Sequence, residues 1–196
     1  MKRPSKAIVL CAGYSTRMKP LTDTRPKCLL PLWGRPALSH TLETLHRWGV
    51  RDVLLNMHHA AQPLLRFALE HASGIPRLNI SFEPDILGTG GAVRRADWFF
   101  EDSPVWLVNS DILLGTGPNS FFGPFSEKKC IASLWVTYTQ GPRTVDICNG
   151  RVTSFRSRTP GAPSTATFCG LHLLDRRILP YIPGSGFSSI IEAYDR

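Results

Sequence analysis

Apolar and polar positions alternate along residues 1–115 in a way that predicts strands and helices in turn. Short apolar runs predict strands, and apolar residues three or four apart, such as Leu38, Leu42 and Leu45, predict a helix. The expected elements are strands at 6–12, 52–57, 78–84 and 105–114, and helices at 37–48, 61–72 and 88–100. Strands that alternate with helices in this way are typical of a parallel sheet with right-handed crossovers.

Residues 116–196 show a different pattern, with shorter apolar segments joined by short links. The expected elements are strands at 130–138, 144–148, 151–155 and 167–174, a hairpin turn at 148–151, and short helices near 175–182 and 187–195. The chain is long enough for one domain with a sizeable core. We therefore predict a single domain over residues 1–196, with an α/β half at 1–115 and a β-rich half at 116–196.

The composition is that of an ordinary globular protein, but a net charge of +8 favours an anionic partner such as a polyphosphate, a nucleic acid or an acidic lipid. The Lys and Arg residues are scattered, except after the first strand, and this argues against a nucleic-acid-binding stripe. No apolar run approaches the roughly 18 residues of a membrane span, and the N-terminus shows no signal-peptide pattern. Five dispersed cysteines without a C-x-x-C pair predict reduced thiols in a cytoplasmic protein.

The segment at residues 10–36 leaves the predicted core strand and at once collects prolines and cations. Gly13 allows the backbone to turn sharply and expose N–H groups to a phosphate. Arg17 offers a planar fork for two phosphate oxygens, and Lys27 places a point charge where the chain re-enters the core. The loop also carries two hydroxyl groups, at Ser15 and Thr16. Together these residue types predict a shaped surface for a polyphosphate.

Asp111 ends the most hydrophobic of the predicted strands. A carboxylate in this place must be paired, hydrogen-bonded or bound to a cation, and next to a phosphate loop a hard ion such as Mg²⁺ is the natural partner. Asn109 lies two residues earlier and shares its face of the strand. The alternative that Asp111 only caps the next turn stays open.

A glycine-rich turn at residues 83–92 precedes a predicted helix, and its glycines allow a flat ligand to approach the backbone. A plain strand-to-helix turn remains the alternative. In open parallel sheets, ligands bind outside the carboxyl ends of the strands. The turn at 83–92, the loop at 12–27 and the strand end at 109–111 are therefore expected to meet in one crevice.

Three stretches of this sequence resemble the signature of the sugar-1-phosphate nucleotidyltransferases, which reads A-G-x-G-[ST]-R-[ML]-x-P-L-T, then P-K-x-L-x-P, then G-x-P. Here the corresponding segments read AGYSTRMKPLT at 12–22, PKCLLP at 26–31 and GRP at 34–36. The segments LGTGGA at 87–92 and VNSD at 108–111 resemble the base-binding and metal-binding stretches of the family. The likeness runs from about residue 6 to the end.

The resemblance implies an α/β, Rossmann-like nucleotide-diphospho-sugar transferase fold, with a mixed, mostly parallel sheet flanked by helices. It also implies a reaction in which a sugar 1-phosphate oxygen attacks the α-phosphorus of an NTP and pyrophosphate leaves. Both GTP and UTP are favoured as the nucleotide, since guanylyltransferases and uridylyltransferases share these stretches. The implied cofactor is Mg²⁺, no nucleic acid or membrane partner is expected, and a homo-oligomer stays open.

The family roles carry over to matching positions of this sequence. The residues expected to bind the nucleotide are Ala12, Gly13, Tyr14, Ser15, Thr16, Arg17, Lys27, Gly88 and Thr89. The residues expected to contact the sugar phosphate are Asn109, Arg158 and Gly170. The residues expected to act in catalysis are Arg17, Lys27 and Asp111, the last as the ligand of Mg²⁺.

Three departures from the family pattern affect these expectations. Ser15 stands where the family has its second loop glycine, and Ser157 and Arg158 replace a sugar-binding Glu and a phosphate-binding Lys. Family members also continue past a segment like 186–196 to a second metal-binding Asp, which this sequence does not contain. The sugar is therefore open, and the alternative function is a non-catalytic module that binds a nucleotide or sugar nucleotide.

Overall fold

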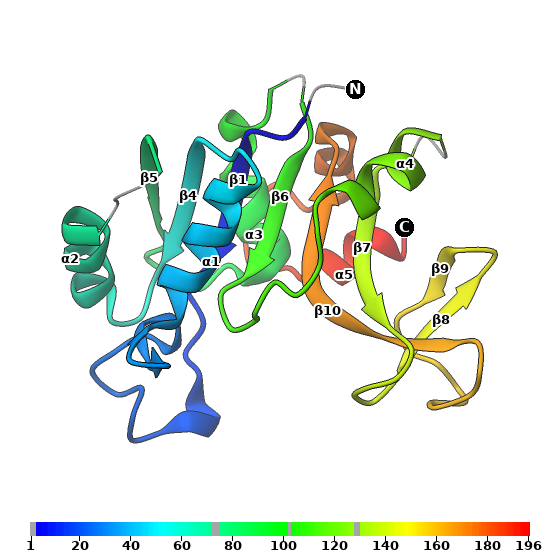
Figure 1. Cartoon of the computed structure of the whole chain (residues 1–196), viewed down its shortest axis with the longest axis horizontal. Helices are drawn as coiled ribbons and strands as arrows, with labels where there is room; N and C mark the ends of the chain where they lie inside the picture. Colours follow the sequence, from blue (N-terminus) through cyan, green and yellow to red (C-terminus); the bar gives the residue numbers. More distant parts are fainter. Residues whose placement is uncertain (1–2, 72–74, 102, 128–129) are drawn as a thin grey trace.

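The computed structural model describes residues 3–71, 75–101, 103–127 and 130–196, and shows a mixed sheet flanked by helices (Figure 1). Its eight strands lie in the order β5-β4-β1-β6-β10-β8-β9, with β7 paired to β10. The strands of the first half, which pair in parallel, are β1 (Lys6–Leu10), β4 (Asp52–Met57), β5 (Arg77–Phe82) and β6 (Val105–Asn109). The strands of the second half, which pair antiparallel, are β7 (Ala132–Thr137), β8 (Val145–Cys148), β9 (Arg151–Ser154) and β10 (Thr165–Leu174).

The long strand β10 joins the two halves, because it pairs antiparallel with β6 on the first-half side and with β7 and β8 of its own half. This mixed sheet confirms the predicted fold class, with parallel pairing confined to the strands of the first half. One sheet thus crosses the predicted boundary at residue 115. The division of a single domain into two halves stays a prediction.

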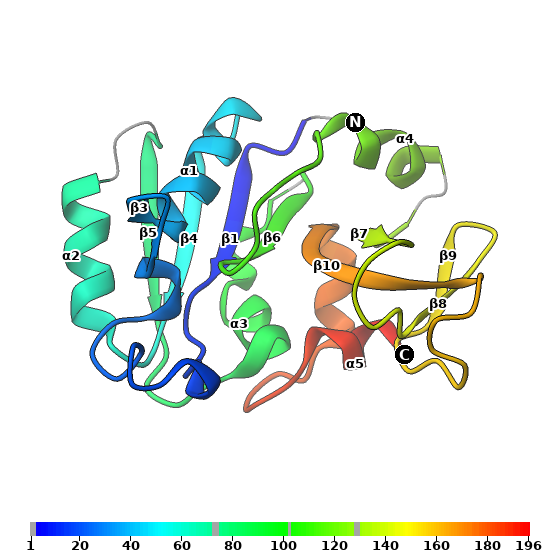
Figure 2. The same cartoon turned by 60° about the horizontal axis from the view of Figure 1, so that its bottom comes forward.

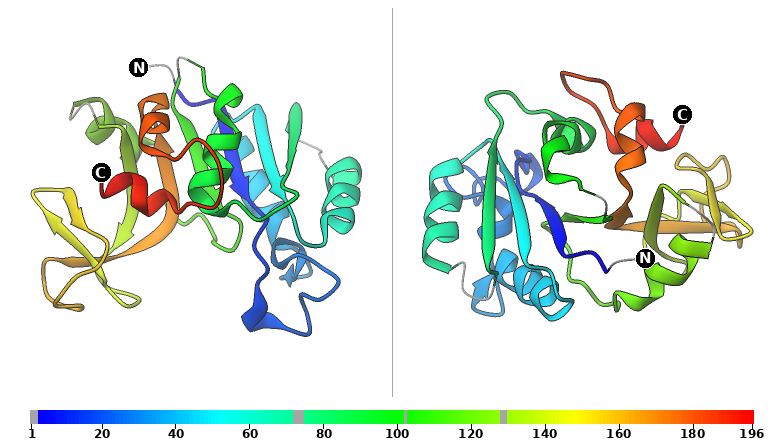
Figure 3. Two further views of the ribbon diagram at one scale, coloured as in Figure 1. Left: turned by 180° about the vertical axis from the view of Figure 1, so that it is seen from behind. Right: turned by 90° about the horizontal axis from the view of Figure 1, so that it is seen from above.

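Helices cover both faces of the sheet, as Figure 2 and Figure 3 show. The helices on one face are α1 (Ala37–Arg47), α2 (Ala61–His71) and α4 (Asn119–Glu127), and those on the other are α3 (Gly88–Arg95), η4 (Arg176–Tyr181) and α5 (Ile190–Tyr194). Strand side chains alternate between the two faces of the sheet. Ala7 and Val9 of β1 therefore pack in the core beneath α1, α2 and α4, and Ile8 packs in the core beneath α3, η4 and α5. In the described part of the chain, no helix has the length and apolar character needed to cross a membrane.

Several predicted elements end earlier than expected. The strand predicted at 105–114 stops at Asn109, and the helix predicted at 88–100 stops at Arg95 and continues as a 3₁₀ turn, η3 (Asp97–Phe99). The segment near 175–182 forms a 3₁₀ helix, with Pro180 inside it. The predicted helix at 61–72 forms up to His71, and residue 72 lies outside the described residues.

Helix α4 was not predicted from the sequence, and its letters, NSFFGPFSE, explain why. Gly and Pro disfavour a helix interior by about 1 and 3 kcal/mol relative to Ala, so local propensity opposes this helix. Tertiary contacts support it instead, because Phe121 packs edge-on against the buried ring of Trp106, with ring centroids 5.1 Å apart. The short ribbon of β2 (Pro31–Leu32) and β3 (Arg35–Pro36) was also missed.

A buried histidine in β10 makes the stability of this fold dependent on pH. His172 is 1% exposed and lies 2.6 Å, through Nδ1, from the hydroxyl of Tyr194. Burial lowers the pKa of His172 from 6.5 to about 3. The folded chain therefore keeps this ring neutral between these values, whereas the unfolded chain takes up a proton as the pH falls below 6.5.

We expect the wild type to lose about 3 kcal/mol of unfolding free energy through this group between pH 7.5 and pH 4.5, where the folded ring remains neutral. Chemical denaturation of the wild type and of His172→Gln across this range measures the loss. The variant should show a shallower decline by that amount, since glutamine does not titrate. Parallel stability curves for the two proteins would show that His172 does not set the pH dependence.

Candidate functional site

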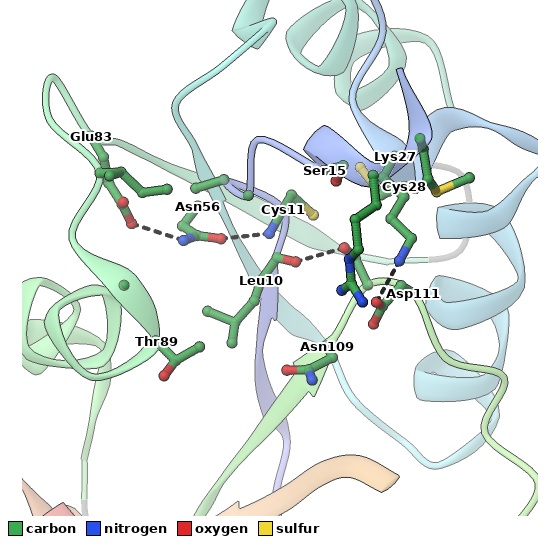
Figure 4. A pocket seen from close by; sticks show the side chains of 17 residues that line it. Leu10, Cys11, Ser15, Lys27, Cys28, Asn56, Glu83, Thr89, Asn109 and Asp111 are labelled. Atoms are coloured by element: carbon green, nitrogen blue, oxygen red, sulfur yellow. Dashed lines mark hydrogen bonds and ion pairs between the residues drawn. The ribbon is translucent and has the colours of Figure 1, made fainter. Parts of the chain in front are cut away.

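A cavity of about 570 Å³ opens where β1 and β6 end. Its walls come from the loop after β1, from the turn after β5 and from the end of β6, so the predicted meeting of these three segments is confirmed. The residues that line it are Leu10, Cys11, Ala12, Gly13, Ser15, Arg17, Met18, Lys27, Cys28, Asn56, Glu83, Ile86, Gly88, Thr89, Asn109, Ser110 and Asp111 (Figure 4).

Most of the residues predicted from the sequence lie around this cavity, and four do not. The predicted residues that line it are Ala12, Gly13, Ser15, Arg17, Lys27, Gly88, Thr89, Asn109 and Asp111. Tyr14, Thr16, Arg158 and Gly170 are not among its lining residues. The position of these four residues therefore does not support their predicted contacts with the substrate. The roles of all thirteen predicted residues stay predictions.

Gly170 still bears on the site, because it packs against one of the lining side chains. A Cβ atom at this position would lie 2.9 Å from Nδ2 of Asn109, and the backbone has a φ of +78°. Only glycine suits both conditions without strain. Arg158, in contrast, is exposed on the loop that follows β9.

The loop after β1 turns at Ser15 and not, as expected, at Gly13. Ser15 has a φ of 51°, in the left-handed region, whereas Gly13 is not among the residues with positive φ. Two hydrogen bonds to the Ser15 carbonyl hold this conformation, from the Met18 N–H at 2.9 Å and from the Thr22 hydroxyl at 3.1 Å. The position at which the family has its second loop glycine is thus the one that requires a left-handed backbone.

Two oppositely charged side chains pair across the cavity. Nζ of Lys27, at the start of η2 (Lys27–Leu29), lies 2.7 Å from Oδ2 of Asp111, just beyond β6 (Figure 4). The side chains are 33% and 41% exposed, so both remain within reach of a ligand. From the sequence we expected Lys27 to bind phosphate and Asp111 to bind a cation. In this structure the two side chains form an ion pair with each other.

Arg17 is a second cation at the cavity. It lies in η1 (Thr16–Met18), is exposed, and makes no hydrogen bond or ion pair with any other described residue. A planar guanidinium whose five N–H donors are all available suits two phosphate oxygens. Within the described ranges, the guanidinium of Arg17 therefore has no protein partner and is available to bind an anion at the cavity.

The floor of the cavity includes two adjacent thiols, Cys11 and Cys28, which are 4% and 1% exposed. Contact with the Cys28 thiol, together with burial, raises the pKa of Cys11 well above its ordinary value. The Cys11 thiol accordingly stays neutral and adds no negative charge to the cavity wall.

The glycine-rich turn packs closely against the chain segment before α5. A Cβ atom at Gly88 would lie 2.5 Å from the carbonyl oxygen of Ser188, and one at Gly91 would lie 2.8 Å from that of Gly186. The N–H groups of Gly90 and Gly91 donate to the Ser188 carbonyl, at 2.9 and 3.3 Å. These glycines therefore admit the chain segment before α5 on this face of the turn, and the approach of a flat ligand to the other face stays a prediction.

Thr89 is engaged by the same segment, since its hydroxyl accepts the N–H of Ile190 at 2.8 Å. The first turn of α3 is thus joined to the start of α5 by backbone and side-chain hydrogen bonds. Thr89 and Gly88 nevertheless line the cavity on their other side. Residues near the end of the chain consequently hold one wall of the site.

Replacing Gly88 by alanine should destabilise the fold by roughly 2–4 kcal/mol, because a left-handed φ of +71° and a 2.5 Å approach to Ser188 both exclude a Cβ atom. Chemical denaturation measures the change. Gly117→Ala is the matched control, since nothing lies within 4 Å of a Cβ atom there and its φ is not positive. Equal effects of the two substitutions would contradict the close packing of the turn on residues 186–189.

Two polar residues of the cavity were missed from the sequence. Asn56 interrupts the apolar letters DVLLNM of β4, and Glu83 follows β5 directly; both are buried, at 4% and 0% exposed. They are hydrogen-bonded to each other, with Nδ2 of Asn56 2.8 Å from Oε1 of Glu83. A polar residue within an otherwise apolar strand was the available signal, because a buried polar group must have a partner.

Asp111 is also the carboxylate best placed to hold a metal ion. Within the described residues, no group of three or more His, Cys, Asp and Glu side chains could form a metal site. Mg²⁺ commonly takes only one or two protein carboxylates and completes its coordination with substrate phosphates and water. One carboxylate, facing a cavity with a free arginine, fits an ion that arrives with a polyphosphate.

Comparisons with known proteins agree with this geometry. A family model described as "Nucleotidyl transferase" matches residues 6–146. The beta catalytic subunit of a mannose-1-phosphate guanylyltransferase from Danio rerio is 38% identical over 112 residues, which cover 55% of this chain and 31% of that protein. A UTP–glucose-1-phosphate uridylyltransferase from a Synechocystis species is 25% identical over an alignment that covers 91% of this chain and 51% of that protein.

The solved structure of an inositol-1-phosphate CTP transferase from T. maritima superposes with a TM-score of 0.80, at 17% identity, over 99% of this chain and 81% of that one. At this identity the superposition shows the shared fold. The chain spans about a third to a half of the length of these two curated relatives. Because the family model covers most of the sequence, including the loop after β1 and the end of β6, the chain belongs to the nucleotidyl transferase family.

Proposed function

We propose that this chain transfers a nucleotidyl group from an NTP to a sugar 1-phosphate, giving an NDP-sugar and pyrophosphate. The observation that carries the proposal is the cavity where β1 and β6 end, with an unpaired Arg17 beside the pair of Lys27 and Asp111. Two cations and the exposed carboxylate of Asp111 at this edge of a parallel sheet suit a triphosphate and its counterion. The family to which the chain belongs supports the same reaction class.

The residues act through position and charge, since the reaction needs no covalent enzyme intermediate. An oxygen of the sugar phosphate attacks the α-phosphorus, and the pyrophosphate leaves in line on the opposite side. Arg17 holds phosphate oxygens in its planar fork, and Lys27 moves away from Asp111 to neutralise charge near the reacting phosphorus. When bound at Asp111, Mg²⁺ would supply further positive charge to the triphosphate.

For the nucleotide we propose GTP in preference to UTP. The Danio rerio relative is a guanylyltransferase and is 38% identical, whereas the uridylyltransferase from Synechocystis is 25% identical, although over a longer part of this chain. The sugar 1-phosphate would approach from the side of Asn109, whose side chain is packed against Gly170. Arg158, which is exposed and does not line the cavity, stays a candidate contact for this substrate.

A second candidate is a module that binds a nucleotide or sugar nucleotide without turnover. One observation favours it: the described residues offer Asp111 without a cluster of further metal ligands, and Asp111 is already paired with Lys27. Such a module would bind a nucleotide through Arg17 and the loop after β1, and it would release no pyrophosphate.

The decisive experiment is calorimetric titration with GTP, UTP, CTP, ATP and dTTP, with and without Mg²⁺, followed by a pyrophosphate-release assay with a panel of sugar 1-phosphates. We expect Mg²⁺-dependent binding of GTP and release of pyrophosphate with at least one sugar. Binding without any pyrophosphate would favour the non-catalytic module. Absence of binding by all five nucleotides would overturn the transferase and a module that binds a nucleotide.

A further inference from the structure

We propose that Asn56 and Glu83 are a positioning pair, which fixes the phosphate-binding loop relative to the turn that begins α3. The proposal rests on the proposed function, because it assumes that a nucleotide spans these two parts of the cavity. Neither residue bears a charge that faces the solvent, and Glu83 has no exposed surface. Its carboxylate therefore acts on the ligand through other groups.

A chain of hydrogen bonds runs through this pair from one wall of the cavity to the other, and Figure 4 shows the two bonds made by Asn56. The N–H of Cys11, at the start of the loop after β1, donates to Oδ1 of Asn56 at 2.6 Å. Nδ2 of Asn56 donates to Oε1 of Glu83 at 2.8 Å, and the N–H of Leu87 donates to Oε2 at 3.0 Å. Leu87 directly precedes Gly88, so the chain joins the two walls.

The donors and acceptors of this chain allow only one arrangement. A carboxylate can only accept, and Glu83 faces one N–H from Asn56 and one from Leu87. The amide of Asn56 must therefore point its NH₂ toward Glu83, and its oxygen is left for the N–H of Cys11. Because both side chains are buried, a reversed amide would leave polar atoms unpaired and away from water.

A second path connects Glu83 to the same loop. Nδ1 of His58 lies 2.8 Å from the carbonyl oxygen of Glu83, and Nε2 lies 2.8 Å from the hydroxyl of Tyr14. A carbonyl only accepts, so Nδ1 carries the proton, and in the neutral ring Nε2 accepts from Tyr14. Tyr14 does not line the cavity, but its hydrogen bond to His58 connects the loop after β1 to the segment that follows β4.

The consequence is a fixed distance between the two ends of the nucleotide site. The loop after β1 would hold the triphosphate, and the turn before α3 would lie along the base. Holding both in advance lowers the ordering cost of binding. Loss of the pair should thus weaken nucleotide binding and raise KM, while kcat changes less.

Exchange of the two functional groups provides the test. Asn56→Asp places two carboxylates together, and Glu83→Gln presents an NH₂ group to donors. The double variant Asn56→Asp/Glu83→Gln restores the chain in reverse. Its introduced aspartate would accept from the N–H of Cys11 and from the glutamine NH₂, and the glutamine oxygen would accept from Leu87. Net charge and side-chain volume are conserved, and the cycle isolates the pairwise interaction.

We expect each single variant to weaken GTP binding, measured by titration with Mg²⁺, by about tenfold or more. The double variant should recover to within about threefold of the wild type, with KM following Kd and kcat within about threefold throughout. Glu43→Gln, a change of the same kind at an exposed residue paired with Arg35, is the control and should leave binding unchanged. Circular dichroism and thermal unfolding report the fold of each variant.

Additive effects, with the double variant at least as weak as the product of the single variants, would overturn the positioning pair. A single variant that binds GTP like the wild type would overturn it as well. If a single variant does not fold, the double variant decides: folding and binding near the wild-type level support the pair, and failure overturns it. A wild-type protein that binds no nucleotide would refute the proposed function before the cycle begins, so the two failures are distinguishable.

Discussion

Lys27→Ala is expected to lower the turnover of nucleotidyl transfer by about 10²–10³-fold, the usual cost of removing one group that stabilises developing charge. Nζ of Lys27 is anchored 2.7 Å from Asp111 at the cavity wall, where it can move to a phosphate oxygen without a change of backbone. The order of preference among the five nucleotides should not change, because the base would lie near the other wall.

Steady-state kinetics with GTP and the best sugar 1-phosphate measure this loss. Lys19→Ala is the matched control, since Lys19 belongs to the same loop, pairs with Asp23 at 3.4 Å and has a side chain that is 60% exposed. The control should retain turnover within about threefold, as expected for a surface pair worth little energy. Wild-type rates in Lys27→Ala would refute the role that we give this lysine.

Asp111→Asn is expected to lower turnover by roughly 10²–10³-fold and to shift its dependence on Mg²⁺ to higher concentration. An amide keeps the shape of the side chain but removes the negative charge that suits Mg²⁺. The same change releases Lys27 from its ion pair, so a nucleotide could bind in the absence of the ion as well as in the wild type or better.

Turnover measured across a series of Mg²⁺ concentrations separates these effects. Asp97→Asn is the control, because this aspartate is paired with Arg94 at 3.9 Å and lies outside the cavity. A lower rate with an unchanged Mg²⁺ dependence would mean that Asp111 serves only to position Lys27. A turnover of Asp111→Asn close to that of the wild type at saturating Mg²⁺ would indicate that another group contributes to the metal site.

The sequence alone determined the order of the strands of the main sheet and the edge of that sheet at which the candidate site lies. Runs such as KAIVL and VWLVN have the period and length of buried strands, and the helix around Leu38, Leu42 and Leu45 has its own period. These are local properties, readable within a few residues. The rule that ligands bind at the carboxyl ends of parallel strands then brought the loop at 12–27 and Asp111 to one place.

Helix α4 and the turn at Ser15 could not be read in this way. The letters of α4 oppose a helix, and tertiary packing, such as that of Phe121 against Trp106, stabilises it. In the loop after β1, the sequence singled out Gly13 as the residue that allows a sharp turn, whereas the left-handed backbone lies at Ser15, whose carbonyl accepts two hydrogen bonds. In both cases a contact outweighs the local preference.

Only the tertiary structure decided which groups of the site are free and which are already engaged. Lys27 and Asp111 are 84 residues apart in the chain, and the glycines at 88–91 meet Ser188 from the other end of the sequence. Asn56 and Glu83 read as isolated polar residues until the sheet places them side by side. Sequence periodicity reports which face a residue occupies, but a hydrogen bond needs two groups within about 3 Å, and that distance is set by the packing of segments that are remote in the chain.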